Sequence, residues 1–269
     1  MENTNDKIIV LPEFQQLKET VERLKTELSM LMLERDELRY VVCKNIEMSY
    51  CLKLGALEYK AFELQCTALR LKRKIDMIQA RINRQEKVDV TCVEKMLDEE
   101  FAAYQKLLEE QVQRMNDAIE RGKAEFLTAE DNRELKKLYR KIVKKLHPDV
   151  NPEVTEAQLR LLENAIEAYK NGDLNTLRII GEMMGDSDSA DLSQNTMSAL
   201  FEEKKRIENL IRVIQNEIEE IKATYPYTLK AIVEDPEKEQ ERRKELEDII
   251  AQYEALIEIY QARLDEMLG

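Results

Sequence analysis

The chain has 269 residues, which is long for one compact domain, so we expect two or more structural units. Hydrophobic residues make up 43% and charged residues 36%, with only 6 glycines, 5 prolines and no tryptophan, which favours long helices and excludes a disordered chain. The net charge of −13 disfavours binding to nucleic acid or to an anionic membrane surface, because both require clustered cations. A local basic patch would instead favour an acidic protein partner.

The cysteine and histidine content argues against metal binding. Cysteines occur at Cys43, Cys51, Cys66 and Cys92, none at the spacing of a zinc or redox motif, and the chain has one histidine. We therefore expect free thiols in a reducing compartment, with no metal and no cofactor. The first residues lack the cationic start of a signal peptide, and no run of 18 apolar residues occurs. These features predict a cytoplasmic protein without a membrane segment.

A heptad pattern opens the chain over residues 13–40. Apolar residues recur at alternating spacings of four and three, at Leu17, Val21, Leu24, Leu28, Leu31 and, one heptad on, Leu38. The pattern predicts a helix with a narrow apolar seam that pairs with one partner helix, in this chain or in a second copy. Because no obvious antiparallel mate lies nearby in sequence, the pattern leans towards self-association as a homodimer.

A wider apolar face continues to about residue 84 and includes Gly55, which suggests the close approach of another helix backbone. β-branched residues at 88–91 predict a break, with Asp or Thr available to cap a helix over about 92–121. We therefore predict that residues 1–121 form an N-terminal coiled-coil and helical arm.

Capping signals define the middle of the chain. Thr128, with Asp131 three residues later, predicts the start of a helix over roughly 129–146. Prolines at 148 and 152 then favour an extended loop. Two further helices are predicted, over about 153–170, ending at Asn171-Gly172, and over about 173–184. Residues 122–185 should thus form a helical bundle of their own.

The last third of the chain returns to heptad spacing. Gly185–Asp191 is polar and is the predicted linker. Apolar residues recur at heptad spacing over 200–221 and again over 246–267, on either side of a turn region that contains two prolines. This arrangement predicts an antiparallel helical hairpin over residues 186–269. With no strand-like alternation anywhere, the predicted fold class is all-α.

The only histidine follows a basic helix and opens the tripeptide His147-Pro148-Asp149. Between residues 132 and 146 seven cations stand against one anion, a local charge of +6. Lys136, Arg140 and Lys144 are four residues apart, so they line one helical face. Such a face favours an acidic partner and predicts binding that weakens with salt.

With the Asn-Pro at 151–152 and Glu167-Ala168-Tyr169 beyond it, this segment resembles a J-domain over about residues 128–184. J-domains are the modules by which DnaJ-type co-chaperones engage DnaK-type ATPase chaperones. The resemblance implies that the tripeptide and the cationic helix face bind the chaperone and stimulate its ATP hydrolysis. The implied partner-binding residues are His147, Pro148, Asp149, Lys136, Arg140, Lys144, Lys145 and Asn151. Tyr139 and Leu146 look like the packing side of the helix.

The segment departs from the J-domain pattern in two places. Family members begin with a short aromatic-rich helix and a Leu-Gly turn, which are missing here. Residues 101–121 would have to substitute, with Phe101, Tyr104, Leu107 or Leu108 as packing candidates. Leu162 stands where the family usually has phenylalanine. No Gly/Phe-rich linker and no CxxC zinc module occur, so the chain is similar to the class that shares only the J-domain.

Two functions follow from these observations. The first is a J-domain co-chaperone whose coiled-coil arms select an unknown partner or client. The second is a coiled-coil scaffold whose J-like module no longer couples to a chaperone. An enzyme is not expected, because His147 has no second histidine, plausible cysteine nucleophile or glycine-rich loop nearby in sequence. No catalytic, cofactor-binding or metal-binding residue is assigned.

Overall fold

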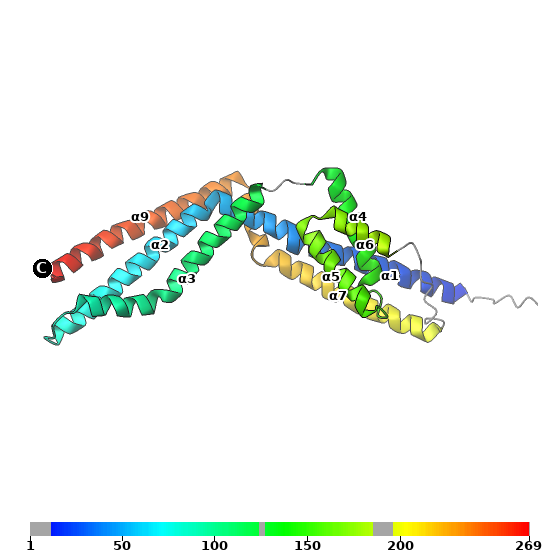
Figure 1. The fold of residues 1–269 in the computed structure, drawn as a ribbon, viewed down its shortest axis with the longest axis horizontal. Coiled ribbons are helices and arrows are strands. Elements are labelled where there is room, and N and C mark those ends of the chain that lie inside the picture. The colour runs from blue at the N-terminus through cyan, green and yellow to red at the C-terminus, as the bar shows by residue number, and fades with distance from the viewer. Residues whose placement is uncertain (1–11, 124–126, 185–195, 269) are drawn as a thin grey trace, which may run out of the picture. The chain divides into compact units, whose positions relative to one another are not determined.

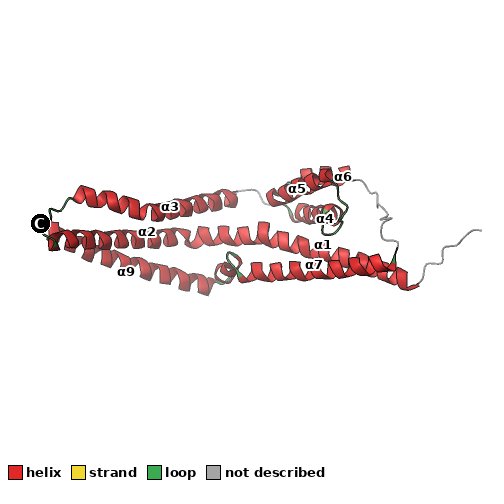
Figure 2. Ribbon diagram, turned by 90° about the horizontal axis from the view of Figure 1, so that it is seen from below, coloured by secondary structure: helices red, strands yellow, loops and turns green. Residues whose placement is uncertain are grey.

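The computed structural model describes residues 12–123, 127–184 and 196–268. In these ranges the chain forms helices and no strands (Figure 2), which confirms the predicted all-α fold class. Gly185–Asp191, the predicted linker, lies outside the described residues. Among the described helices, none combines the length and the apolar character that crossing a membrane requires.

The chain divides into two compact units that interleave in sequence. Unit 1 contains residues 1–43 and 125–225, and unit 2 contains residues 44–124 and 226–269. The sequence had suggested three consecutive segments instead, 1–121, 122–185 and 186–269. The division differs because a heptad seam shows that a helix has a partner but does not identify that partner.

The framework of unit 1 is a pair of long helices, α1 (Pro12–Glu37) and α7 (Met197–Ala223). They lie side by side and run in the same direction (Figure 1, Figure 2). Leu28 of α1 and Ile207 of α7 are fully buried. The apolar seam predicted over 13–40 therefore has its partner within the chain, in a helix more than a hundred residues away in sequence.

Ion pairs border this apolar contact. The Lys222 ammonium lies 3.1 Å from the Glu34 carboxylate, and the Arg39 guanidinium lies 3.3 Å from that of Glu217. These groups are partly exposed, so they contribute little stability compared with the buried seam. The structure also corrects the predicted hairpin over 186–269. The buried face of α7 is used in unit 1, and the second heptad helix belongs to unit 2.

Three shorter helices complete unit 1: α4 (Ala129–Leu146), α5 (Glu156–Asn171) and α6 (Leu174–Met183). They pack on one another, and α4 also packs on α1. Their shared apolar residues are fully or nearly fully buried, namely Leu135, Ile142, Val143, Leu146, Val150, Leu162, Ala165, Leu174, Leu177 and Ile180. The predictions that Leu146 and Leu162 face a helical core are confirmed.

Local capping chemistry sets the ends of these helices. The Thr128 hydroxyl accepts a hydrogen bond from the backbone N–H of Asp131 at 3.1 Å, which confirms the predicted start of α4. At the end of α5, Gly172 adopts a φ of 68°, a left-handed conformation that favours glycine. The predicted helix end at Asn171-Gly172 is thus also confirmed.

Unit 2 is built from α2 (Cys43–Asn83), α3 (Val90–Lys123) and α9 (Pro236–Leu268). A π-helical turn, Leu38–Val42, lies between α1 and α2 in the sequence. Asp89 caps α3 by accepting the backbone N–H of Cys92 at 3.1 Å, so the predicted break and cap are confirmed. A 3₁₀ turn, Tyr227–Leu229, and α8 (Lys230–Val233) precede α9.

The contacts of α2 define the direction of its two neighbours. Arg70 of α2 binds Glu94 and Asp98 of α3 at 2.6 and 2.7 Å, whereas Gly55 lies beside Met115, so α2 and α3 are antiparallel. The neighbour of Gly55 is thus a methionine side chain, where the sequence had suggested a helix backbone. One core cluster joins Leu54 to Leu246 and another joins Ile78 to Leu264, so α9 follows α2 in the same direction.

Residues 101–121, the candidates for the first helix that the J-domain resemblance requires, belong to unit 2 and not to the unit that holds α4, α5 and α6. They form part of α3 in unit 2, where Phe101 packs against the core cluster of Ile78 and Leu97. Tyr104 and Leu107 are exposed. The substitution predicted for this segment is therefore wrong, because its apolar face is used to cover α2. In unit 1, the long helix that packs on α4 is α1.

Candidate functional site

The His147-Pro148-Asp149 loop leaves the C-terminus of α4 as a tight turn. The His147 backbone N–H donates to the Val143 carbonyl at 2.9 Å, and the His147 carbonyl accepts the N–H groups of Val150 and Asn151 at 3.0 and 2.8 Å. Val150 is buried and anchors the far side of the turn. The loop is therefore held by its own backbone, with the Pro148 ring exposed at its tip.

The side chain of His147 is part of this turn. Its Nδ1 accepts a hydrogen bond from the backbone N–H of Asp149 at 3.1 Å, which requires that nitrogen to be unprotonated. Burial lowers the pKa of His147, and the Arg35 guanidinium adds to that effect, while the carboxylates of Asp149 and Asp36 oppose it. The ring is thus uncharged at neutral pH, and only 18% of its side chain is exposed.

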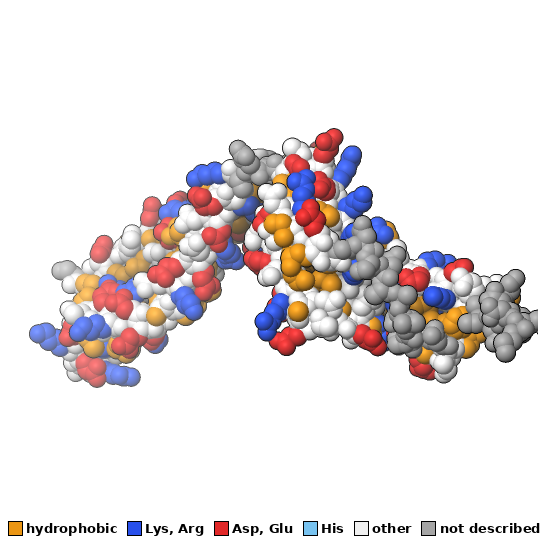
Figure 3. Space-filling view, turned by 45° about the vertical axis from the view of Figure 1, so that its right-hand side comes forward, with side chains coloured by type: hydrophobic (Ala, Val, Ile, Leu, Met, Phe, Trp, Pro, Cys, Tyr) orange, Lys and Arg blue, Asp and Glu red, His pale blue; other side chains and the backbone are white. Residues whose placement is uncertain are grey.

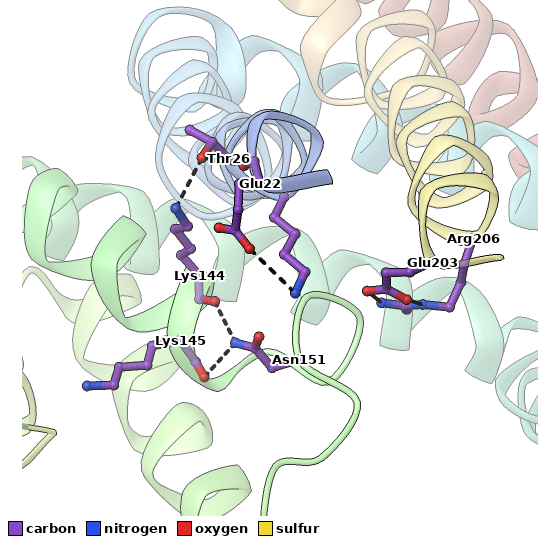
Figure 4. Close-up of polar contacts among 8 residues, drawn as sticks. Glu22, Thr26, Lys144, Lys145, Asn151, Glu203 and Arg206 are labelled. Atoms are coloured by element: carbon purple, nitrogen blue, oxygen red, sulfur yellow. Dashed lines mark hydrogen bonds and ion pairs between the residues drawn. The ribbon is translucent and has the colours of Figure 1, made fainter. Parts of the chain in front are cut away.

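Asp149 presents its carboxylate more openly, with 42% of the side chain exposed. One of its oxygens lies 3.8 Å from Nδ1 of His147. The hydrogen bonds to Glu203 raise the pKa of Arg206 on α7, and the charge of Asp149 contributes to that shift. The Arg206 guanidinium already binds both oxygens of Glu203, at 2.7 and 2.8 Å (Figure 4). Asp149 is therefore near a cation and retains exposed oxygen atoms.

Asn151 is used inside the loop. Its side-chain amide donates to the carbonyls of Lys144 and Lys145 at 2.8 and 2.9 Å (Figure 4). The last carbonyls of a helix have no partner within the helix, so this amide caps α4 and fixes the loop to it. In this structure Asn151 supports the tripeptide by holding the turn.

The four cations assigned to the docking face point in more than one direction. Lys136 forms an ion pair with Glu37 at the end of α1. The Lys144 ammonium donates to the Thr26 hydroxyl of α1 at 3.1 Å (Figure 4). Lys145 instead donates to the Met184 carbonyl beyond α6 at 2.9 Å. Arg140 is half-buried. The structure thus brings Lys136 and Lys144 together against α1 and places Lys145 on a different side of α4.

Two stacked tyrosines lie at the centre of the contact between α4 and α1. The rings of Tyr139 in α4 and Tyr169 in α5 are 4.1 Å apart, and both are buried. The prediction that Tyr139 lies on the packing side is confirmed. Its hydroxyl donates to the Asp36 carboxylate of α1 at 2.7 Å, and the Arg35 guanidinium contacts the same carboxyl at 2.8 Å. Burial, followed by the charge of Asp36, raises the pKa of Tyr139, so the phenol remains a donor.

The residues on the α1 side of this contact were not predicted. Asp36 and Glu37 come at the end of a heptad helix, where acidic residues are common and usually solvated. The chain has 55 acidic residues, so their type alone gives no signal. The one available signal is that two adjacent acidic residues in α1 complement the cationic face of α4. This signal identifies Asp36 and Glu37 only when it is known that α1 packs on α4.

The described residues offer no candidate metal site. They contain no group of three or more His, Cys, Asp or Glu side chains able to hold a metal ion. The cysteines are free thiols, as predicted. In Figure 3, lysine and arginine side chains are interspersed with acidic ones on the face shown. On α4, Lys137 and Lys141 are exposed, so part of its positive charge faces outward.

No family, no curated protein and no solved structure matches this chain.

Proposed function

We propose that this protein is a J-domain co-chaperone that recruits a DnaK-type chaperone and stimulates its ATPase. The observation that carries the proposal is the His147-Pro148-Asp149 turn at the end of a basic helix. The turn is held by backbone hydrogen bonds and capped by Asn151, and it exposes Pro148 and much of Asp149. A preformed loop of this kind loses little conformational entropy when a partner binds it.

The surrounding charges are consistent with an acidic partner. Exposed cations on α4, such as Lys137 and Lys141, would steer such a partner towards the loop, and the exposed Asp149 carboxylate would accept hydrogen bonds from a cation on it. The two units offer long helical surfaces for selecting a client. On this proposal the protein has no catalytic turnover of its own.

The test is steady-state ATP hydrolysis by a DnaK-type chaperone from the same organism, with increasing amounts of the full chain. We expect the wild type to stimulate hydrolysis and His147→Gln to be inactive, with a thermal unfolding profile that is unchanged at neutral pH. A matched control is Gln158→Ala, a change outside the loop that affects only the cap of α5. Equal stimulation by wild type and His147→Gln would refute the role of the tripeptide.

The alternative is a scaffold in which the α4–α6 bundle serves as a structural element. One observation favours it: Lys136 and Lys144, two of the docking cations, already have partners on α1. A scaffold would stimulate no chaperone in any variant. It would, however, lose helix packing when Tyr139 or Asp36 is replaced.

A further inference from the structure

We propose that α1 is an internal occupant of the cationic face of α4, so that an acidic partner gains this face only after α1 has been displaced. The inference rests on the proposed co-chaperone function and adds its regulation. It follows from which groups of α1 meet which groups of α4 within unit 1.

The contact is one of complementary chemistry. Glu37 pairs with Lys136, Asp36 accepts a hydrogen bond from Tyr139, and Thr26 accepts one from Lys144. These three contacts span residues 26–37 of α1 and 136–144 of α4, about two turns of the basic helix. An acidic partner that used the same cations would have to replace Glu37 and Thr26. The two occupants are therefore mutually exclusive at Lys136 and Lys144.

The contact is also suited to opening. The ion pair of Lys136 and Glu37 is partly exposed, with 35% of Lys136 and 30% of Glu37 accessible to water, whereas the hydrogen bond of Tyr139 to Asp36 is buried. Polar interfaces between parts of a chain separate more readily than large apolar ones. The helices α4, α5 and α6 also pack on one another, so each keeps contacts within the bundle that do not involve α1.

In the closed arrangement, in which α1 packs on α4, one buried polar group is left without a hydrogen-bond partner, and this also favours opening. Among the described residues, the Tyr169 hydroxyl is one of the few buried polar groups with no hydrogen-bond partner. Glu37 and Asp36 lie near enough that their charges raise its pKa, after the larger effect of burial. Opening would hydrate this hydroxyl, because α1 covers the region around it. The closed state thus carries a cost that the open state does not.

The test compares the full-length wild type with Glu37→Lys, which replaces the attraction to Lys136 by repulsion. Glu27→Lys is the matched control, because it makes the same charge change at an exposed position on the same helix. Two readouts are used: acetylation of Lys144 followed by mass spectrometry, with exposed Lys137 as internal reference, and stimulation of the DnaK-type ATPase. Lys144 is chosen because it contacts Thr26 and is not a partner of Glu37.

In Glu37→Lys we expect faster acetylation of Lys144 and stronger ATPase stimulation, each by about two- to fivefold, as for the loss of one partly exposed ion pair. Glu27→Lys should match the wild type in both. The milder Glu37→Gln is measured as well, so that the comparison holds even if Glu37→Lys lowers the thermal midpoint of the chain. Wild-type acetylation and stimulation in both Glu37 variants would overturn the inference. Faster Lys144 acetylation without stimulation by any variant would support closure by α1 and refute the co-chaperone function.

Discussion

The stacked pair of Tyr139 and Tyr169 allows a direct comparison. The same substitution, tyrosine to phenylalanine, should lower the stability of the protein at one position and not at the other. Both rings are buried and face each other at 4.1 Å. The Tyr139 hydroxyl donates to the Asp36 carboxylate, whereas the Tyr169 hydroxyl has no partner among the described residues. Replacing either tyrosine with phenylalanine removes one oxygen atom and leaves the ring in place.

The magnitude follows from the hydrogen bonds involved. A hydrogen bond to a charged group contributes roughly 1.5–3 kcal/mol, and its loss in Tyr139→Phe also leaves the buried Asp36 with only Arg35 beside it. We therefore expect Tyr139→Phe to lower the free energy of unfolding of unit 1 by about 2 kcal/mol. Tyr169→Phe removes a buried hydroxyl that has no partner, so it should be neutral or raise that free energy by about 1 kcal/mol.

Differential scanning calorimetry of the full chain would measure both variants. For a unit of roughly 150 residues, 1 kcal/mol corresponds to a change of about 2–4 °C in Tm, so Tyr139→Phe should melt about 4–8 °C earlier. Tyr169→Phe should melt at the wild-type temperature or slightly above it. Equal destabilisation by the two variants would refute the reasoning, since it would mean that the rings alone, and not the bond to Asp36, account for the stability.

Two further predictions concern the same unit. Gly172→Ala should lower the free energy of unfolding by about 1–2 kcal/mol, because φ is 68° at this position and an added Cβ would lie 3.4 Å from the Leu127 side chain. Chemical denaturation measures this loss, and an unchanged midpoint of unfolding would contradict the prediction. Because burial lowers the pKa of His147 below the ordinary 6.5, the unfolded chain binds the proton more tightly. Stability should therefore be complete above pH 6.5 and fall as the pH drops below it, and His147→Gln should reduce this dependence between pH 7.5 and 5.5 in thermal melts.

Features governed by neighbouring residues could be predicted from the sequence. Thr128 begins α4 and Gly172 ends α5, because a side-chain cap and a left-handed C-terminus depend only on a few adjacent positions. The proline-bearing loop after Leu146 follows from the missing N–H and the fixed φ of proline. The hydrogen bonds of Asn151 are equally local, but the sequence does not show which carbonyl groups its side-chain amide meets.

The pairing of helices could not be predicted in the same way. The heptads of α1, α7 and α9 present similar apolar seams, and many pairings would bury similar area. Two heptad helices around a proline-bearing turn predict an antiparallel hairpin, but the seam of α7 lies on α1. The contact of Lys136 with Glu37 could not be predicted for the same reason, because it depends on the packing of α1 on α4.

The parallel course of α1 and α7 has a consequence for how unit 1 assembles during synthesis. Two helices that run in the same direction cannot be joined by a short turn, and here residues 38–196 separate them. The bundle of α4, α5 and α6 forms through contacts between helices that are close in sequence. The apolar seam of α1, in contrast, can be buried against α7 only after that much later segment has been synthesised. On the ribosome, the loop-bearing bundle can therefore form while α1 is still without its long-range mate. Until α7 has been synthesised, the apolar seam of α1 is therefore free to pack against other helices of the nascent chain, and these contacts must be exchanged for the contact with α7 in the finished protein.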